Sequence, residues 1–396
     1  MLSSLSEKAT SRKEPLIWLI AGEASGDLYG ALLAENLHKL NPRAKIQGMG
    51  GVKMKAAGVD ILVDSSELGV IGLIEVMGMI FKFLKIMKFL VSEAILRRPD
   101  AVVMIDYPGF NIRFAKKLKK AGIPVIWYIS PQVWVWRKSN IPKLAEYCRK
   151  MMVIFPFEVE VYKGSGLDVE FSGHPLVEIV RRRKDPAISR DPDKFLLLPG
   201  SRKSETKRLF NVMLQSAWLL KKQHPEMQFF VATPREKVFK DIQEKFSAFA
   251  QQNPDFPREA FTITCGETSR HLQNCCGAFA ASGTITVESA IAGLPLVVAY
   301  KLNPITFLLA RLIIKKLFRN AFTMPNIIMN KCVFEEFLQH EFTPETLAAA
   351  AEKILPGGER HAAVEKDMQE MVRELSCGNV DAAKRAAEII LETCSQ

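Results

Sequence analysis

The sequence has few cysteines and no pattern that would pair them. There are seven, an odd number, and none belongs to a Cys-x-x-Cys motif. This excludes a disulfide framework and gives no support to a zinc site, so we expect a reducing, cytoplasmic environment. We expect no secretory signal either, because the first apolar run, residues 15–21, is short and leads straight into a glycine turn.

Long apolar runs and metal-binding patterns are also lacking. No stretch reaches the roughly 20 consecutive apolar residues that span a bilayer. The nearest, residues 68–91, is interrupted by one glutamate and three lysines. The only Asp-x-Asp triplet, residues 191–193, lies in a proline-rich stretch, and we interpret it as a solvated turn rather than a magnesium site. We therefore expect no metal and no bound cofactor.

Positive charge is in excess. The chain has 54 basic and 43 acidic residues, a net charge of +11. This excess suggests nucleic acid, a phosphate-bearing substrate or an anionic membrane surface as a partner, although a basic composition without a specific partner is the alternative. The basic residues interleave with Phe, Leu and Ile and form no polar groove with stacking aromatics, which favours lipid. We expect no nucleic-acid partner.

Short apolar runs alternate with helical patterns along the chain. Leu16–Ala21 predicts a buried strand, residues 22–26 a tight glycine loop, and Leu28–Leu40 a helix, which together open a doubly wound domain. Strands separated by helices favour parallel α/β sheets over a sandwich. Further strands are predicted at residues 101–105, 124–129 and 151–155, and again at 195–198, 228–232, 278–281 and 296–300.

These two similar halves indicate two Rossmann-like domains. The stretch 171–194 is rich in proline and loses its apolar period, which is typical of a linker. We predict an N-terminal domain at residues 1–175, a linker at 176–194 and a C-terminal domain at 195–365. Helices at 366–396 should pack back toward the N-terminal domain. The carboxyl ends of both sheets would then face each other across a cleft.

Polar residues follow the first predicted strand. Glycines at such a turn let the backbone approach a ligand, and the following helix N-terminus favours an anion. The triad Glu23, Ser25 and Asp27, at the carboxyl edge of a sheet, favours a binding site that includes Gly22 and Gly26. The alternative is a tight turn capped by Ser25 or Asp27.

Asp106 ends another buried strand, in the sequence Ile105-Asp106-Tyr107-Pro108-Gly109. A carboxylate at this edge is either a helix N-cap or a general base, and a base must reach an acceptor hydroxyl. The proline and glycine hold the turn in shape, which suits a positioned side chain. We favour the base.

An aromatic segment follows the next strand. Trp134, Trp136 and Arg137 lie close together in the sequence Ser-Pro-Gln-Val-Trp-Val-Trp-Arg. The rings are suited to forming a wall for a sugar or apolar face, with Arg137 binding a phosphate. The alternative for one of the rings is a plug in the core.

The second half repeats this pattern with residues suited to a nucleotide. A glycine turn, a hydroxyl and an arginine at a helix start, in Gly200, Ser201, Arg202 and Glu205, are typical of a phosphate cradle, although such short matches are common. The run Ser282-Gly283-Thr284 opens a further helix, and small hydroxyl residues there bind diphosphate. Glu288, one turn later on the same face, is suited to accept hydrogen bonds from a ribose diol.

Two segments mix apolar and basic residues in a way that suits a lipid interface. Residues 76–91 carry phenylalanine, leucine and isoleucine between three lysines, and residues 305–322 have the same character. Such helices can insert apolar side chains among lipid headgroups. Two ordinary buried helices are the alternative. Having both segments in a basic chain favours contact with a membrane surface.

Taken together, these motifs resemble the lipid A disaccharide synthase family. The resemblance rests on A-G-E-A-S-G-D, I-D-Y-P-G-F-N, S-P-Q-V-W-V-W-R, L-P-G-S-R, A-S-G-T-x-T-x-E and M-P-N, in this order, and covers nearly the whole chain. It implies the GT-B fold and an inverting transfer of 2,3-diacylglucosamine from its UDP derivative to 2,3-diacylglucosamine 1-phosphate. The products are a β-1,6-linked disaccharide 1-phosphate and UDP.

The resemblance also implies roles for single residues. Asp106 matches the general base, and Glu23 with its loop matches the acceptor side. We count both Asp106 and Glu23 as candidate catalytic residues. Arg202, residues 282–284 and Glu288 match the UDP site, as does Asn326. Family members often continue after this asparagine with a small residue and Gly-Arg-Glu, whereas this chain has Met-Asn-Lys-Cys at residues 329–332. No role is therefore assigned to that segment.

Other functions stay open on the sequence alone. Another GT-B UDP-sugar transferase or a UDP-sugar epimerase would keep the nucleotide site without lipid-facing helices. A non-catalytic lipid- or nucleotide-binding protein would not need Asp106 at its strand end. The resemblance implies a peripheral position on the inner face of the inner membrane in a Gram-negative cell, and the sequence is compatible with a homodimer.

Overall fold

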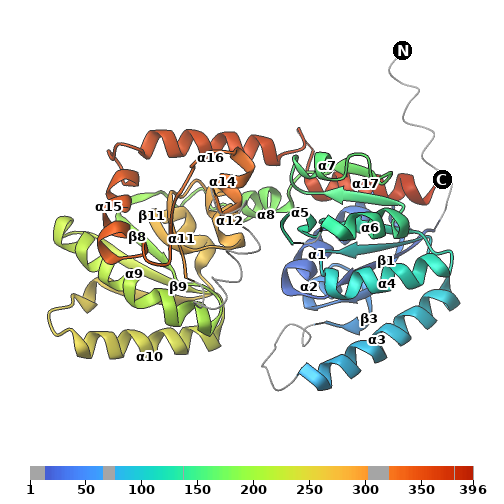
Figure 1. Ribbon diagram of the computed structural model, residues 1–396, viewed down its shortest axis with the longest axis horizontal. Helices are drawn as coiled ribbons and strands as arrows, with labels where there is room; N and C mark the ends of the chain where they lie inside the picture. Colours follow the sequence, from blue (N-terminus) through green and yellow to red (C-terminus); the bar gives the residue numbers. More distant parts are fainter. Residues whose placement is uncertain (1–13, 66–75, 137, 302–320, 379, 396) are drawn as a thin grey trace, which may run out of the picture. The chain divides into compact units, whose positions relative to one another are not determined.

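The computed structural model describes residues 14–65, 76–136, 138–301, 321–378 and 380–395. The chain forms two compact units (Figure 1). Unit 1 comprises Met1–Pro175 and Leu375–Gln396, and unit 2 comprises Leu176–Glu374. Each unit is a parallel sheet with helices packed on it, so the predicted doubly wound α/β architecture is confirmed.

The sheet of unit 1 has the strand order β3-β2-β1-β4-β5-β6-β7, and every pairing is parallel. Its centre is β1 beside β4, where Ile17 pairs with Ala101 and Ala21 with Ile105. Both strands are buried on both faces, which is why they appear in the sequence as continuous apolar runs. The strands are β1 Leu16–Ala21, β2 Lys45–Gly50, β3 Asp60–Asp64, β4 Ala101–Ile105, β5 Val125–Tyr128, β6 Lys150–Val153 and β7 Asp168–Phe171.

Helices cover both faces of this sheet, and each helix buries the side that packs against the strands. On one of these faces α3 and α4 pack together, and Met87, Leu90 and Phe114 join the core there. The helices are α1 Ala24–Leu40, α2 Val52–Ala56, α3 Val76–Arg97, α4 Pro108–Lys120, α5 Val133–Trp136, η2 Lys138–Asn140, α6 Ile141–Tyr147, α7 Glu158–Val161 and α17 Ala382–Cys394.

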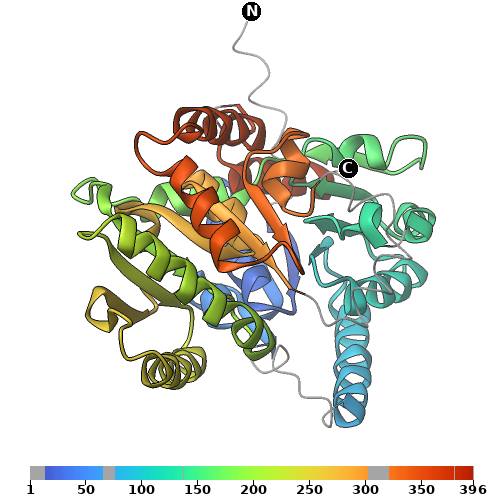
Figure 2. The same cartoon turned by 60° about the vertical axis from the view of Figure 1, so that its left-hand side comes forward.

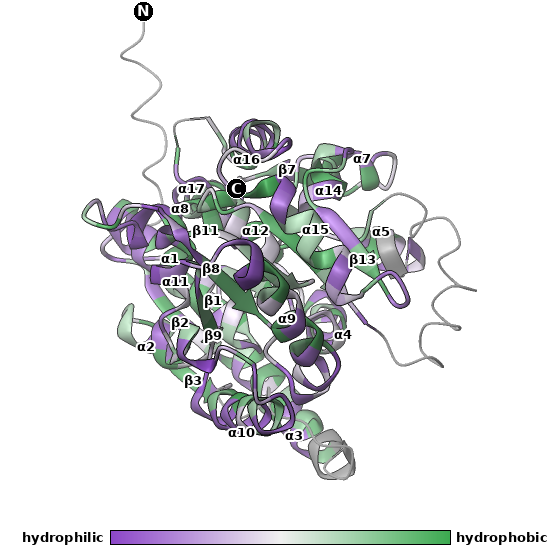
Figure 3. Cartoon of the chain, turned by 90° about the vertical axis from the view of Figure 1, so that its left-hand side faces the viewer, coloured by the Kyte–Doolittle hydropathy of each residue, from purple (hydrophilic) through white to green (hydrophobic). Residues whose placement is uncertain are grey.

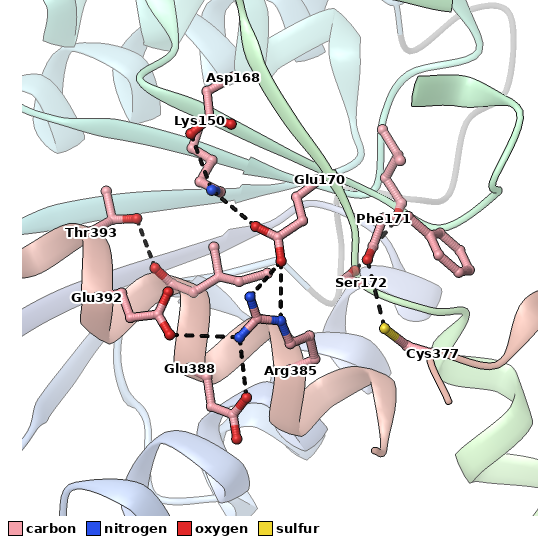
Figure 4. A network of polar contacts seen from close by, with 12 residues as sticks. Lys150, Asp168, Glu170, Phe171, Ser172, Cys377, Arg385, Glu388, Glu392 and Thr393 are labelled. Atoms are coloured by element: carbon pink, nitrogen blue, oxygen red, sulfur yellow. Dashed lines mark hydrogen bonds and ion pairs between the residues drawn. The ribbon is translucent and has the colours of Figure 1, made fainter. Parts of the chain in front are cut away.

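Helix α17 belongs to unit 1 although the helix before it belongs to unit 2. It packs along α1 and is fixed to the sheet by charge. Arg385 places Nη2 2.6 Å and Nε 3.0 Å from Oε1 of Glu170 on β7, and it also pairs with Glu388 and Glu392 (Figure 4). Lys150 on β6 bridges to Glu170 from the other side. The apolar face of α17 is fully buried, at Ala383, Ala386, Ala387, Ile389 and Ile390.

Unit 2 repeats the architecture with the strand order β10-β9-β8-β11-β12-β13. Its strands are β8 Asp191–Leu198, β9 Gln228–Thr233, β10 Phe261–Cys265, β11 Cys275–Ala281, β12 Leu296–Tyr300 and β13 Glu335–Leu338. Its helices are α8 Pro175–Arg183, α9 Lys203–Gln223, α10 Glu236–Gln252, η3 Arg258–Ala260, α11 Thr268–Asn274, α12 Thr284–Ile291, α14 Met324–Met329, α15 Pro344–Ile354 and α16 His361–Leu375. In Figure 3 the central strands are hydrophobic, whereas α10 carries both colours.

The predicted linker is wrong in extent. Residues 176–183 form most of α8, and β8 begins at Asp191, four residues before the predicted strand. The arginine cluster interrupts the apolar period, so the sequence pattern did not predict this helix. The arginines lie in the last turn of α8, where cations interact favourably with the helix dipole. Strands β2, β3, β7, β10 and β13 are also absent from the sequence prediction, because they mix polar and apolar residues and lack a continuous apolar run.

Helix α3 leaves large apolar side chains in solvent. Phe81 is 70% exposed, Leu84 60% and Leu96 77%, although other residues of the helix enter the core. The helix extends along the outside of unit 1 (Figure 2). In the part of the chain that the structure describes, no helix is long and apolar enough to cross a membrane. The second predicted lipid-facing segment, 305–322, lies almost entirely outside the described residues.

A buried carboxylate joins the first two helices. Asp27 on α1 is 8% exposed, and its oxygens accept hydrogen bonds from the backbone N–H groups of Gly51, Lys53 and Met54, at 2.7, 3.1 and 3.0 Å. These donors belong to the start of α2 and have no partner within their own helix. Asp27 therefore caps α2 from a neighbouring helix and is a structural residue.

Replacing Asp27 with alanine should lower the free energy of unfolding by about 2–3 kcal/mol, because it leaves three backbone donors without their charged acceptor. Urea unfolding followed by circular dichroism measures this change. The matched control is Asp255→Ala, which removes an exposed aspartate from unit 2 and should have little effect. Equal stability of the two variants would contradict the capping role.

Candidate active site

Asp106 lies at the carboxyl end of β4, in a backbone conformation that is rare for a side-chain-bearing residue. Its φ is +48°, and that of Tyr107 is +52°. The turn is held by Asp106 N–H donating to the Tyr128 carbonyl at 3.0 Å and by the Asn111 side-chain amide donating to the Asp106 carbonyl at 2.7 Å. Consecutive left-handed residues cost free energy and tend to persist at functional sites. The N-cap of α4 is Tyr107, so the capping alternative for Asp106 is not supported.

The surroundings of the Asp106 carboxyl suit a base. Burial, and then repulsion from Glu23, raise its pKa from 3.8 to about 6, while the backbone N–H of Tyr107 lowers it by donating a hydrogen bond. Within the described ranges no basic side chain forms an ion pair with it. A carboxyl with this pKa is ionised at neutral pH yet basic enough to accept a proton from a substrate hydroxyl.

Gly22 and the Tyr107 ring lie against each other beside Asp106. A Cβ on Gly22 would stand 2.1 Å from Cδ1 of the Tyr107 ring, so only glycine lets the ring lie over the end of β1. The ring stacks on Phe83 of α3 and on Phe110 of α4, each with a centroid distance of 6.1 Å. Burial and Glu23 raise the pKa of Tyr107 to about 12, so its hydroxyl stays protonated at neutral pH.

The rest of the first motif divides into two groups. Helix α1 already begins at Ala24, so the predicted loop 22–26 is shorter than expected and Ser25 lies in the first helical turn. Glu23 and Ser25 are exposed, and Glu23 lies close enough to Asp106 to raise its pKa. Gly26 is buried against Ala21, and Asp27 caps α2. Of the predicted site residues in this motif, only Glu23 and Ser25 therefore have exposed side chains.

The aromatic segment fits the core alternative for one ring. Trp134 packs edge-on against Phe157, with a centroid distance of 5.1 Å, and is partly buried. The side chain of Trp136 and all of Arg137 lie outside the described residues.

The sequence analysis did not predict Glu158, because no recognisable motif surrounds it. It is 1% exposed beside Trp134 and Ser130, and burial raises its pKa to about 7.

In unit 2, Glu205 of α9 accepts hydrogen bonds from the loop that follows β8 and so fixes this loop. Glu205 Oε2 accepts from the N–H groups of Ser201 at 2.9 Å and Arg202 at 3.3 Å, and its Oε1 lies 3.0 Å from the Arg202 guanidinium. Gly200 has φ +110°, and a Cβ there would stand 2.5 Å from Glu205. Glu205 therefore organises the loop, while Arg202, with its side chain 77% exposed, carries the available cation.

The loop after β11 lies beside this one, because β8 and β11 are neighbours in the sheet and both run in the same direction. Gly283 and Thr284 are exposed at the start of α12, and no side chain caps this end. The free N–H groups of such a helix start suit a phosphate. Glu288, one turn later, is mostly sheltered. Its Oε1 accepts a hydrogen bond from Arg183, which the sequence prediction did not include.

Asn326 is structural. Its amide nitrogen donates to the Phe334 carbonyl and to Glu336, each at 2.8 Å, and its oxygen accepts from the N–H groups of Val333 and Phe334, each at 2.9 Å. Asn326 is 2% exposed and makes all of these bonds, so it fixes α14 against β13 instead of presenting its amide to a ligand.

Residues 329–332, which depart from the family pattern, are fixed by the ion pairs of Lys331. Lys331 pairs with Asp367 and Glu370 of α16, at 2.8 and 2.7 Å. These ion pairs hold the end of α14 against α16.

Within the described part of the chain, no three His, Cys, Asp or Glu side chains gather into a group that would hold a metal ion.

Comparison with known proteins adds to this geometry. A family model described as lipid-A-disaccharide synthetase matches residues 17–391. The lipid-A-disaccharide synthase of Koribacter versatilis is 36% identical over 390 residues, covering 96% of this chain and 99% of that protein. That of Neisseria gonorrhoeae is 34% identical over 382 residues, covering 95% and 96%.

Solved structures with the same fold are more distant in sequence. The UDP-GlcNAc 2-epimerase from Neisseria meningitidis bound to UDP-GlcNAc has a TM-score of 0.63 at 11% identity, covering 96% of this chain and all 100% of the other. Medicago truncatula UGT71G1 complexed with UDP-glucose has a TM-score of 0.60 at 12% identity, covering 97% and 99%. These likenesses concern the fold, whereas the family match covers nearly the whole sequence. The chain belongs to the lipid-A-disaccharide synthetase family and is a glycosyltransferase of lipid A biosynthesis with the GT-B fold.

Proposed function

We propose that this chain transfers 2,3-diacylglucosamine from UDP-2,3-diacylglucosamine to 2,3-diacylglucosamine 1-phosphate, with inversion at the anomeric carbon. The products are the β-1,6-linked lipid A disaccharide 1-phosphate and UDP. The observation that carries the proposal is the Asp106 carboxyl at the end of β4, whose pKa is raised to about 6 by burial and by Glu23. A protein that only binds lipid or nucleotide has no use for a base held in a strained turn.

In the proposed reaction Asp106 removes the proton from the acceptor's 6-hydroxyl. The oxygen forms a bond to the anomeric carbon from the face opposite UDP, and the bond from that carbon to the diphosphate oxygen breaks. The electron pair leaves with UDP, and the proton stays on Asp106. This step needs one base and a means of stabilising the departing diphosphate.

Unit 2 has groups suited to the nucleotide. The exposed Arg202 guanidinium offers a cation to the diphosphate, and the uncapped N–H groups at Thr284 offer hydrogen bonds. Glu288 offers carboxylate oxygens to the ribose hydroxyls. A cation and a helix N-terminus can stabilise the leaving group without a metal, so we propose a reaction that needs neither metal nor cofactor.

The exposed apolar residues of α3 support binding at a membrane surface. Phe81 and Leu84 lie in solvent on the same face of the helix, with Lys85 and Lys88 beside them. Apolar side chains can enter the headgroup region while lysines meet anionic phosphates. Both proposed substrates are acylated and reside in such a surface. We therefore propose a cytoplasmic enzyme at the inner face of the inner membrane.

Replacing Asp106 with alanine should lower the rate of acceptor-dependent UDP release by about 10²–10⁴-fold, the usual effect of losing a general base. The assay measures UDP released from UDP-2,3-diacylglucosamine, with and without the 1-phosphate acceptor, in EDTA. Asp106→Asn, which keeps the shape of the side chain, should be equally impaired. Wild-type activity should survive the chelator.

Each other outcome has a definite meaning. Normal UDP release by the Asp106 variants would remove this residue as the base and leave the family assignment standing. Loss of wild-type activity in EDTA would overturn the metal-free scheme. A wild-type protein that binds UDP but releases none from this donor would favour another UDP-sugar transferase or an epimerase.

The rate should depend on pH through Asp106. Because its pKa is raised to about 6, kcat/KM should fall about tenfold per pH unit below that value, where the base becomes protonated. The acceptor's phosphate titrates in the same range. Glu23→Gln separates the two effects, since removing the repulsion lowers the Asp106 pKa and should move the acid limb to lower pH. An unmoved limb would assign it to the substrate.

Replacing Phe81 and Leu84 together with serine should weaken binding to vesicles of phosphatidylethanolamine and phosphatidylglycerol by about 10–100-fold. Full burial of each apolar side chain contributes about 1.5–3 kcal/mol, and insertion among the headgroups buries roughly half of each side chain. Sedimentation with the vesicles measures this. Val52→Ser is the matched control, because Val52 is 72% exposed on α2, outside α3. If both variants bind like the wild type, α3 is not the membrane-contacting surface.

A further inference from the structure

The cation that faces Glu288 comes from an element outside the nucleotide motifs. Arg183, the last residue of α8, places Nη1 3.1 Å from Oε1 of Glu288, across 105 positions in the sequence. The arginine side chain is 40% exposed and that of the glutamate 19%, so the carboxylate is sheltered and the guanidinium covers one side of it. In the described residues, no protein donor contacts the other oxygen, Oε2.

Arg183 is held in place by a second residue. The side-chain amide of Gln273, on α11, donates to the Arg183 carbonyl at 3.1 Å and to the Ser269 carbonyl at 3.0 Å. Its oxygen accepts from the N–H of Asp185 at 2.8 Å. Gln273 thus clamps the carboxyl end of α8 against α11 and fixes the backbone from which the guanidinium extends.

Among the described residues, few other charges lie near Glu288. The Arg190 guanidinium donates to the Ala292 carbonyl at 3.0 Å, just after the end of α12. Helix α12 carries no second charged residue, and α14, which packs against it, carries none. Strand β12 contributes Tyr300, and β11 contributes the thiols of Cys275 and Cys276, whose pKa values are raised by burial. Burial raises the pKa of Glu288, and Arg183 is the charged group that lowers it. Arg183 thus favours the ionised form of Glu288.

We propose that Arg183 is a positioning residue for nucleotide binding: it holds Oε1 of Glu288 so that the carboxylate is oriented to accept hydrogen bonds from the ribose hydroxyls. The proposal rests on the nucleotide role of Glu288 proposed above. It adds a residue that lies outside the sequence motifs and acts through the carboxylate instead of contacting the reacting atoms.

The test is UDP binding by isothermal titration calorimetry between pH 5.5 and 8, with wild type, Arg183→Gln, Arg183→Lys and Glu288→Gln. Arg183→Gln should weaken binding about tenfold at the acidic end, the loss expected for a hydrogen bond to a charged group, because without the guanidinium the Glu288 pKa rises further and less of the carboxylate is ionised. The ratio of its Kd to that of wild type should shrink as pH rises, because Glu288 then ionises without help. Taking this ratio cancels the titration of UDP itself.

Matched variants separate charge from structure. Lys184→Gln removes the same charge from the next residue, which is exposed and whose side chain forms no hydrogen bond or ion pair in the described residues, and it should bind UDP like wild type. Arg183→Lys keeps a cation and should restore most of the affinity. Gln273→Leu releases the clamp and should weaken binding in the same pH-dependent way as Arg183→Gln, to a smaller extent. Circular dichroism melting checks that each variant folds.

Two results would overturn the proposal. Equal or tighter UDP binding by Arg183→Gln would mean that the arginine is dispensable or competes with the ribose for Glu288. A loss that is the same at every pH and is not restored by lysine would assign Arg183 a purely structural role. Failure of the proposed function has a different signature, because then wild type would not bind UDP or Glu288→Gln would bind it as tightly as wild type.

Discussion

The parallel alignment of the strands is the constraint on which the chemistry of both units depends. Every strand of each sheet runs the same way, so every β-to-α loop opens at one edge. In unit 1 this brings the loop carrying Glu23, after β1, next to the loop carrying Asp106, after β4. In unit 2 it brings Arg202 and Thr284 to the ends of β8 and β11. Neither arrangement requires special contacts between the loops, since the pairing of neighbouring strands places them together.

This constraint explains why much of the fold follows from the sequence. Strands buried on both faces must be apolar throughout, and the runs at Leu16–Ala21 and Ala101–Ile105 coincide with β1 and β4. Asp106 could be singled out because a carboxylate directly after such a strand has its position fixed. Edge strands such as β3 and β13 carry polar residues on their exposed sides, and their local pattern does not distinguish them from loops. Helix α8 was missed because its arginines interrupt the apolar period.

The site residues that resisted prediction are those whose side chains serve partners distant in sequence. Asp27 belongs to a motif that predicts ligand binding. Its carboxylate oxygens instead accept hydrogen bonds from backbone N–H groups at the start of α2, 24 to 27 residues away. The side-chain amide of Asn326 is likewise hydrogen-bonded, to the backbone of the residues just before β13. Arg183 is the reverse case, an arginine in an apparent linker that lies against Glu288. The direction of a side chain depends on tertiary contacts, and no local spacing encodes it.

The return of α17 to unit 1 has a consequence for how the protein is made. Unit 2 is inserted within unit 1, and the apolar face of α17 covers α1. Because the chain emerges from the ribosome N-terminus first, β1 to β7 are synthesised well before the helix that completes their packing. Unit 2 lies within one continuous stretch and can fold as it appears. Unit 1 must wait with one side of α1 uncovered, so the domain synthesised first is the one completed last.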